Sequence, residues 1–186
     1  MFFSGKEVRV TSEYVESSQG DAEEIAKTLQ QVDTLLASEK LHQLYQGDAA
    51  ELRKNVRKML VSIRTDLEAL DNLEKEDPFK TDPTLANQRY KLIKNIESAK
   101  VDFEFEIVPA LEKLTRQVVE TSKQNPPAQV DEQALPPPPP GEKWTVQKVL
   151  DTASQFVEQA ARAGAIFTKA YTLAKALGLV LGIPIP

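Results

Sequence analysis

Apolar residues recur every three or four positions along most of this chain, and this spacing limits its fold more than any other feature. Side chains spaced in this way lie on one face of a helix, which must be buried against other helices. The pattern therefore predicts an all-α fold. The apolar residues concerned are Ile25, Leu29, Val32 and Leu36, then Leu52, Val56, Met59, Ile63, Leu67, Leu70 and Leu73, then Tyr90, Ile93, Ile96, Phe103, Ile107, Leu111, Leu114 and Val118.

Residues that start and stop helices divide this pattern. Gly20 is expected to end a short N-terminal helix, and Asp21 is placed to cap the next one. A second long helix is predicted over residues 49–76, about 42 Å long at 1.5 Å per residue. The Asp77-Pro78 pair should end it, and Asp82-Pro83 carries a cap and a first-turn proline for a third. The short connection predicts that these two long helices pack as an antiparallel hairpin.

Prolines mark two further places in the chain. Pro109 lies inside the third apolar pattern, so a kink is expected near Phe105. Pro126-Pro127 and the run Pro136–Pro140 cannot continue a helix and favour a stiff polyproline II spacer. The same run could serve as a ligand for an aromatic groove. The predicted organisation is an elongated antiparallel helical bundle over 1–123, a proline-rich linker over 124–143 that acts as a hinge, and an amphipathic to apolar helix over 144–186. The hinge would let the C-terminal helix dock on the bundle or be released from it.

This C-terminal segment differs from the rest of the chain in charge. Residues 143–186 hold five basic and two acidic residues, a net charge of +3, so the remainder carries −8 of the total of −5. No charged residue follows Lys175. Soluble proteins seldom expose an apolar run such as 176–185, so the tail should pack in the core, contact a partner or enter a lipid interface.

A membrane-spanning role for the tail is disfavoured by insertion energies. The nine Leu, Ile, Val and Phe residues of 163–185 contribute about −3 to −5 kcal/mol, whereas Lys169 and Lys175 cost up to about 3 kcal/mol each. An interfacial helix or a self-associating one fits better. The residues expected to form this membrane or partner surface are Phe156, Arg162, Phe167, Lys169, Tyr171, Lys175, Leu177, Leu179 and Leu181.

Composition excludes most catalytic and metal sites. The chain has no Cys and one His, which removes thiol chemistry, thiolate zinc sites and multi-histidine centres. Glu39 and His42 match half of a di-iron pattern, but the second Glu-His pair cannot exist. No nucleophile turn or phosphate-binding glycine loop is present. We therefore expect no enzyme activity, no metal, no cofactor and no small-molecule substrate.

A basic stripe interrupts the acidic body. Arg53, Lys54, Arg57 and Lys58 could meet a phosphate or an acidic partner, although a solvated, ion-paired helix face is the plainer interpretation. Nucleic-acid binding is not expected, because the net charge is negative and no aromatic residues lie among these cations.

Two hypotheses for function follow. The first is a non-enzymatic helical interaction protein, an adaptor or membrane-acting effector, whose C-terminal helix binds an anionic membrane surface or self-assembles. The second is a structural or scaffold protein whose C-terminal helix completes its own core or a homo-oligomer. The partner is then a second copy or another protein. The N-terminus lacks a cationic start followed by an apolar run, so a cytoplasmic location is expected, peripheral at the membrane under the first hypothesis.

Overall fold

The computed structural model describes residues 12–45, 47, 49–79, 82–127, 135, 137–138 and 143–185. Within these ranges all regular structure is helical, which confirms the predicted all-α class. The elements are α1 (Ser12–Leu36), α2 (Glu39–Leu44), α3 (Ala49–Glu76), α4 (Pro83–Asp102), a π-helical turn η1 (Phe103–Ile107), α5 (Val108–Gln124), α6 (Val146–Arg162) and α7 (Ile166–Leu181).

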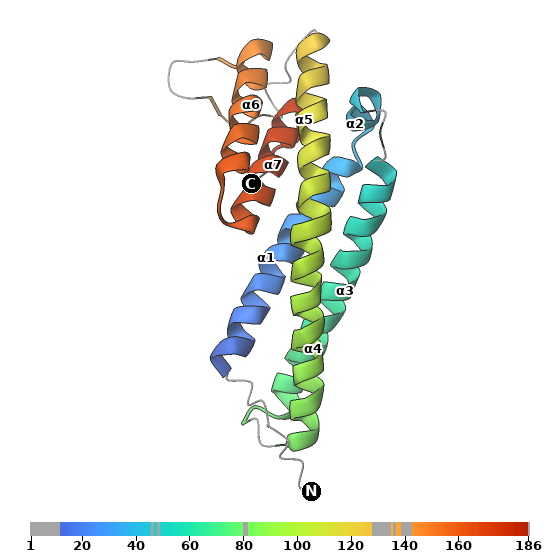
Figure 1. Ribbon diagram of the computed structural model, residues 1–186, viewed down its shortest axis with the longest axis vertical. Coiled ribbons are helices and arrows are strands. Elements are labelled where there is room, and N and C mark those ends of the chain that lie inside the picture. Colours follow the sequence, from blue (N-terminus) through green and yellow to red (C-terminus); the bar gives the residue numbers. More distant parts are fainter. Residues whose placement is uncertain are drawn as a thin grey trace, which may run out of the picture.

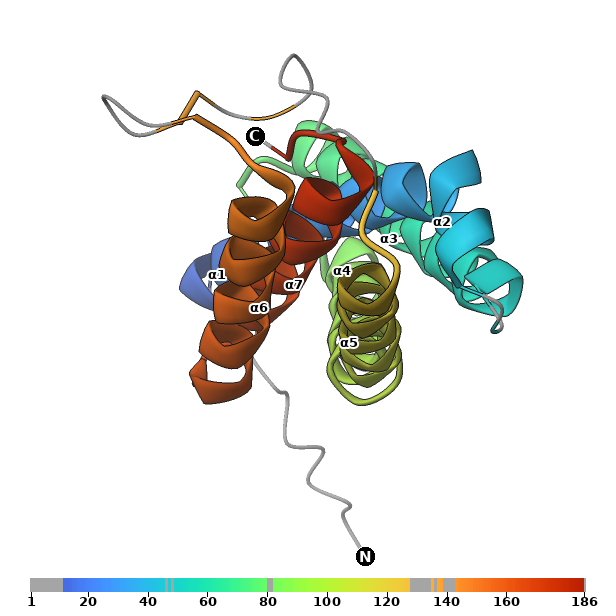
Figure 2. The ribbon, with the colours of Figure 1, turned by 90° about the horizontal axis from the view of Figure 1, so that it is seen from above.

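The long helices lie side by side and successive ones reverse direction (Figure 1). Helices α4, η1 and α5 follow one another as a single long rod, and α1 and α3 pack against each other and against this rod. Helices α6 and α7 form a hairpin beside α5 at one end of the molecule (Figures 1 and 2). One apolar core takes buried side chains from every one of these helices.

The α3–α4 connection confirms the predicted helix ends. Helix α3 spans Ala49–Glu76, and Asp82 caps α4 by accepting a hydrogen bond of 2.8 Å from the Thr84 backbone N–H. Pro83 occupies the first turn, where no N–H is needed. The hydrogen bonds from Thr84 hold the pKa of Asp82 below its usual value of 3.8.

A buried ion cluster lies at this same end. Arg89 is only 4% exposed, and its Nε lies 3.2 Å from Glu74 Oε1. Its Nη2 lies 3.9 Å from Asp77 Oδ2, and Asp77 also accepts a hydrogen bond from the Asp82 backbone N–H at 3.1 Å. One arginine thus links the end of α3, the connection and α4.

The prediction that Gly20 ends a helix is wrong. Helix α1 runs through it without interruption, and Asp21 therefore caps nothing. Val15 and Ala22, on either side of Gly20, are both buried in the core, as is Ile25. A glycine in a helix interior costs about 1 kcal/mol, which burial of a continuous apolar face easily outweighs. Residues 1–11, where the rest of the expected N-terminal helix would lie, are outside the described ranges.

The disturbance expected near Phe105 takes the form of the π-helical turn η1. The Val108 N–H donates to the Phe103 carbonyl, five residues back. Pro109 has no N–H to donate to Phe105, and its ring would crowd that carbonyl in a regular α-turn. Widening the turn by one residue relieves this crowding and lets the helix continue as α5.

The single C-terminal helix predicted over 144–186 is also wrong, because the segment forms the two helices α6 and α7. Helix α6 begins at a cap in which Thr145 Oγ1 accepts from the Lys148 N–H at 3.2 Å. The chain turns at 163–165, where Ala163 and Ala165 are extended. The turn lets the apolar faces of both helices contact the same core, which one straight helix could not do. The proline run 136–140 lies mostly outside the described residues.

Candidate functional site

The leucines of the predicted C-terminal surface lie in the core. Leu177 is fully buried, and Leu179 and Leu181 are 8% and 5% exposed. Helix α7 contacts α1, α5 and α6, and viewed from above it lies among these helices (Figure 2). These three leucines therefore pack inside the monomer, and their role in a membrane or partner surface stays a prediction for a released tail.

The aromatic residues of that predicted surface lie at the edge of the same core. The ring of Phe167 stacks on Phe103 with centroids 6.2 Å apart, and Lys100 Nζ lies 5.9 Å from the Phe167 centroid. Lys175 Nζ lies 4.6 Å from the Tyr171 ring centroid, a cation–π contact within one helix. Phe156 is half-buried on α6 and Arg162 is exposed at its end.

Lys169, expected to attract lipid headgroups, instead joins α7 to α5. Its Nζ lies 2.7 Å from Glu112 Oε2, and Arg116 Nη2 lies 2.8 Å from Glu112 Oε1. The hydrogen bonds from Lys169 and then Arg116 hold the pKa of Glu112 below its usual 4.5, against the opposing effect of its partial burial. Of the predicted cations, Arg162 is therefore the most open to solvent.

The C-terminal end of α7 is closed by a turn that depends on two glycines. Gly182 has a φ of 70°, and its N–H donates to the Gly178 and Leu179 carbonyls. The Ile183 N–H donates to Gly178 O at 2.8 Å. A Cβ on Gly178 would lie 2.5 Å from Ile183 O, so only glycine lets the returning chain approach this closely. The returning chain borders a cavity of about 140 Å³ lined also by Leu135, Phe156 and Lys175.

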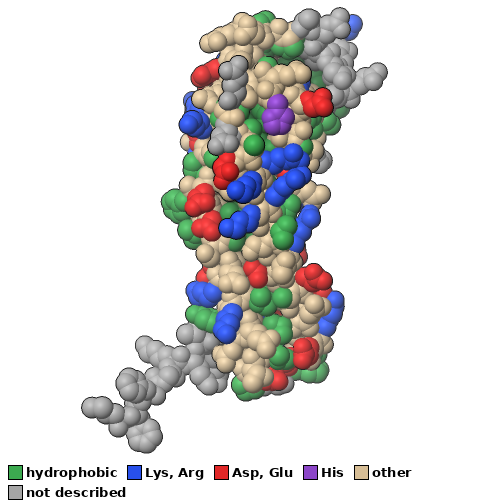
Figure 3. Space-filling view, turned by 90° about the vertical axis from the view of Figure 1, so that its right-hand side faces the viewer, with side chains coloured by type: hydrophobic (Ala, Val, Ile, Leu, Met, Phe, Trp, Pro, Cys, Tyr) green, Lys and Arg blue, Asp and Glu red, His purple; other side chains and the backbone are tan. Residues whose placement is uncertain are grey.

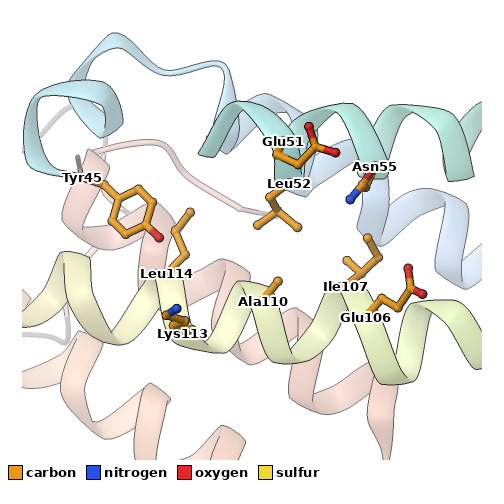
Figure 4. Close-up of a pocket in the computed structure, with 9 residues that line it drawn as sticks. All are labelled: Tyr45, Glu51, Leu52, Asn55, Glu106, Ile107, Ala110, Lys113 and Leu114. Carbon is orange, nitrogen blue, oxygen red and sulfur yellow. The ribbon is translucent and has the colours of Figure 1, made fainter. Parts of the chain in front are cut away.

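A groove between α3 and the η1–α5 part of the rod was not predicted from the sequence. One hollow of about 240 Å³ has an apolar floor that includes Leu52, Ala110 and Leu114 (Figure 4). Glu51 and Glu106 border it. A second hollow of about 450 Å³, more polar, continues from it toward α4, and the two share Asn55, Glu106 and Ile107. The signal in the sequence was Pro109, because the π turn that it favours forms part of the wall.

The two hollows of the groove are lined by polar as well as apolar side chains. The polar ones supply carboxylates, two amides, two lysine amines, two serine hydroxyls and a phenol, and Glu51 and Glu106 are both exposed. No hydrogen-bonded nucleophile–base pair lies among the groove residues that the structure describes. What this arrangement can do is bind polar or apolar groups of a partner.

The basic stripe is partly held by α1. Arg53 Nε and Arg57 Nε both donate to Asp33 Oδ1, at 2.9 and 2.8 Å, and Arg64 Nη2 donates to Gln30 Oε1 at 2.6 Å. Burial alone would raise the pKa of Asp33, but the hydrogen bonds from Arg57 and Arg53 outweigh it and lower that pKa below 3.8. Figure 3, which looks at the α2–α3 side, shows basic side chains gathered below the histidine.

The ion-paired interpretation of this stripe holds for the two arginines next to α1. The two lysines are more open: Lys54 has a side chain 77% exposed and only a 3.9 Å pair to Glu51, and Lys58 is exposed on the same helix. The stripe is therefore both a structural link to α1 and a charged outer face.

Two kinds of site are not found in the described part of the chain. No three His, Asp or Glu side chains there gather closely enough to hold a metal ion, and His42 is exposed on α2. Among the described helices, none combines the length and apolar character required to cross a bilayer.

Comparison with models of known protein families, with curated proteins and with solved structures finds no match for this chain. Its function must therefore be argued from its own residues.

Proposed function

We propose that this chain is a non-enzymatic helical interaction protein whose C-terminal hairpin is a permanent part of its body. The observation that carries this proposal is the burial of α7 among α1, α5 and α6. Ala170, Leu173, Ala174, Ala176 and Leu177 are all fully buried. At about 25 cal/mol per Å² of apolar surface, releasing such a helix into water would cost many kcal/mol, a large part of a domain's net stability.

Several contacts support this role for the hairpin besides apolar burial. Lys169 of α7 is bonded to Glu112 of α5, and the Phe103–Phe167 stack joins α7 to the π turn. These contacts are made by the same side chains that a released, membrane-bound tail would need. This favours the hypothesis of a C-terminal segment that completes its own core over that of a releasable arm.

The proline-rich segment 124–143 fits this proposal as a tether between α5 and α6. Leu135 is 9% exposed and borders the cavity at the end of α7, beside Phe156 and Ile185. A linker that packs one of its own side chains on the hairpin restrains the hairpin. We therefore propose a tether in place of the hinge considered from sequence.

The interaction role is supported by apolar side chains on the outside of the long helices. Phe105 and Val101 are 69% and 53% exposed four residues apart on the rod, and Phe79 is exposed at the α3–α4 connection. Exposed large apolar residues that share a helix face are typical of contact surfaces. We propose that the elongated body presents such faces to other proteins.

Truncation after Pro140 tests the proposal. Removing α6 and α7 would expose the buried faces of α1 and α5, so we expect loss of the cooperative thermal transition in circular dichroism. The matched control is Arg162→Ala, which changes an exposed residue of the hairpin and should leave the transition in place. A truncated chain that stays folded and monomeric would contradict the proposal.

Co-sedimentation with anionic liposomes separates the membrane hypothesis from this one. The full-length chain should stay in the supernatant, because Lys169 and the leucines of α7 are occupied within the fold. Binding to vesicles that contain phosphatidylserine, abolished by Lys169→Glu with Lys175→Glu, would favour the membrane-acting effector.

A further inference from the structure

A line of exposed side chains runs along the outer face of α3 with the alternating spacing of three and four residues. We call this line the α3 seam. Val61, at its centre, is 65% exposed, and the side chain of Lys54 is 77% exposed. Spacing of this kind keeps one stripe of a helix facing a neighbouring helix over several turns. The seam consists of Lys54, Arg57, Val61, Arg64, Glu68, Asp71 and Lys75, all exposed.

The order of charges along the seam is complementary to itself. The N-terminal half carries Lys54 and Arg57. The C-terminal half carries Glu68 and Asp71, and also Arg64 beside the middle of the seam and Lys75 at its end, where Lys75 Nζ lies 2.5 Å from Asp71 Oδ2. If a second α3 lies antiparallel with the two-fold axis midway between Val61 and Arg64, Lys54 faces Asp71 and Arg57 faces Glu68. A two-fold interface requires such self-complementarity, because each contact occurs twice.

Helix α1 holds the arginines of the seam in place. Asp33 Oδ1 accepts a hydrogen bond from Arg57 Nε, and Gln30 Oε1 accepts one from Arg64 Nη2. Each guanidinium is therefore already oriented before a partner binds. Side chains fixed in advance lose less rotamer entropy on binding.

We propose that the α3 seam binds the α3 seam of a second copy of this chain in antiparallel orientation. We assign a second copy as the partner because α3 alone supplies both the basic residues and the acidic residues that face them when two copies of the helix lie antiparallel. The inference goes beyond the interaction role proposed above, because the seam is a different surface from the one that includes Val101, Phe105 and Phe79. The seam is polar and one helix wide, so the contact is weak and salt-sensitive.

The Lys54:Asp71 pair gives the sharpest test, because the ion-pair partners of these two residues, Glu51 and Lys75, lie on α3 itself and not on α1. Lys54→Glu and Asp71→Lys should each weaken dimerisation, measured by sedimentation velocity, by about tenfold, since each places two like-charged pairs across the axis. The double variant and an equimolar mixture of the two single variants should each recover to within about threefold of the original chain. Raising salt from about 0.05 to about 0.5 M should weaken the original dimer.

Disulfide trapping provides a second measurement for a weak dimer. The chain has no Cys, so Val61→Cys introduces one thiol, close to the two-fold axis. Mild oxidation of this variant should give a covalent dimer, whereas Gln117→Cys, exposed on α5, should not. The matched control for charge is Lys91→Glu, an exposed lysine off the seam, which should leave dimerisation unchanged.

A monomer at every concentration up to about 1 mM, together with no selective trapping at Val61, would overturn the seam proposal. A dimer that is insensitive to Lys54→Glu would do the same. Neither result affects the role of the hairpin, which is judged by thermal unfolding of the truncated chain. Failure of the inference and failure of the proposed function are therefore distinguishable.

Discussion

The two ends of the molecule are held together by different interactions. At the hairpin end, α7 is surrounded by apolar side chains, and its charged residues Lys169 and Lys175 lie at the edge of that core. At the opposite end, the α3–α4 connection closes around the buried Arg89, which lies against Glu74 and Asp77. Apolar burial is non-directional and tolerates changes of similar volume, whereas a buried ion cluster requires every partner.

This difference shows what each end contributes. The hairpin end stabilises the body through the size and fit of its side chains. Shortening a buried side chain there should therefore lower the free energy of unfolding strongly, whereas changing a charge at the edge of the core should lower it only slightly. The α3–α4 end depends on specific pairing, so removing one charge should be costly there. The predictions below test this contrast, from the largest expected effect to the smallest.

Leu177→Ala should have the largest effect of the four. The side chain is fully buried among the helices that enclose α7, so its removal should lower the free energy of unfolding by about 4 kcal/mol, near the upper part of the range for leucine truncations. Urea unfolding measures this loss. Val101→Ala, at an exposed site, should change the value by less than about 0.5 kcal/mol. Similar losses for both would show that α7 is not enclosed as described.

Arg89→Ala should lower the free energy of unfolding by about 3 kcal/mol, because it removes the buried guanidinium that lies against Glu74 and Asp77. Lys94→Ala provides the control: Lys94 pairs with Glu97 at 2.9 Å on the same helix but is exposed, and its loss should cost less than about 1 kcal/mol. If Arg89→Ala were as mild as the control, the connection would be held by apolar contacts alone, and the contrast between the two ends would disappear.

Local signals in the sequence were sufficient to predict both ends of α3 and the start of α4. The α3–α4 connection could be placed from the pairs Asp77-Pro78 and Asp82-Pro83, because a cap or a proline affects only the helix turn next to it. Pro109 similarly located the disturbance at Phe105. Each of these residues acts through its own backbone or its nearest neighbours.

Tertiary packing decided the rest. Gly20 has the residue type of a helix end, but the shared core on both sides of it keeps α1 continuous. The apolar spacing of 146–178 reads as one helix, because spacing does not record where a chain folds back on itself. Leu177 and Leu179 are leucines whether they contact lipid, a partner or this core, so residue type alone does not show what they pack against. The groove and the α1 partners of Arg57 and Arg64 depend on helices distant in sequence.

Gly178→Ala tests the close approach at the end of the hairpin. The new Cβ would lie 2.5 Å from Ile183 O, so the returning chain must shift, and we expect a loss of about 1–2 kcal/mol in thermal unfolding. Gly164→Ala is the matched control, since a Cβ there meets nothing within 4 Å. A Gly178→Ala variant as stable as this control would mean that the last residues of the chain do not pack on α7.

Glu112→Gln should have the smallest effect, and one that depends on pH. Lys169 lowers the pKa of Glu112 in the folded chain below 4.5, so the ion pair contributes stability above that value and loses it as the pH falls through the lowered pKa. At neutral pH the variant should be less stable by under about 1 kcal/mol, because the pair lies at the partly exposed edge of the core. The difference between the two chains should then shrink as the pH falls below 4.5. Glu104→Gln, an exposed position on the rod, should show no such convergence. A difference between Glu112→Gln and the original chain that stays constant with pH would mean that Lys169 does not hold α7 to α5 through this carboxylate, and that the hairpin end depends on apolar packing alone.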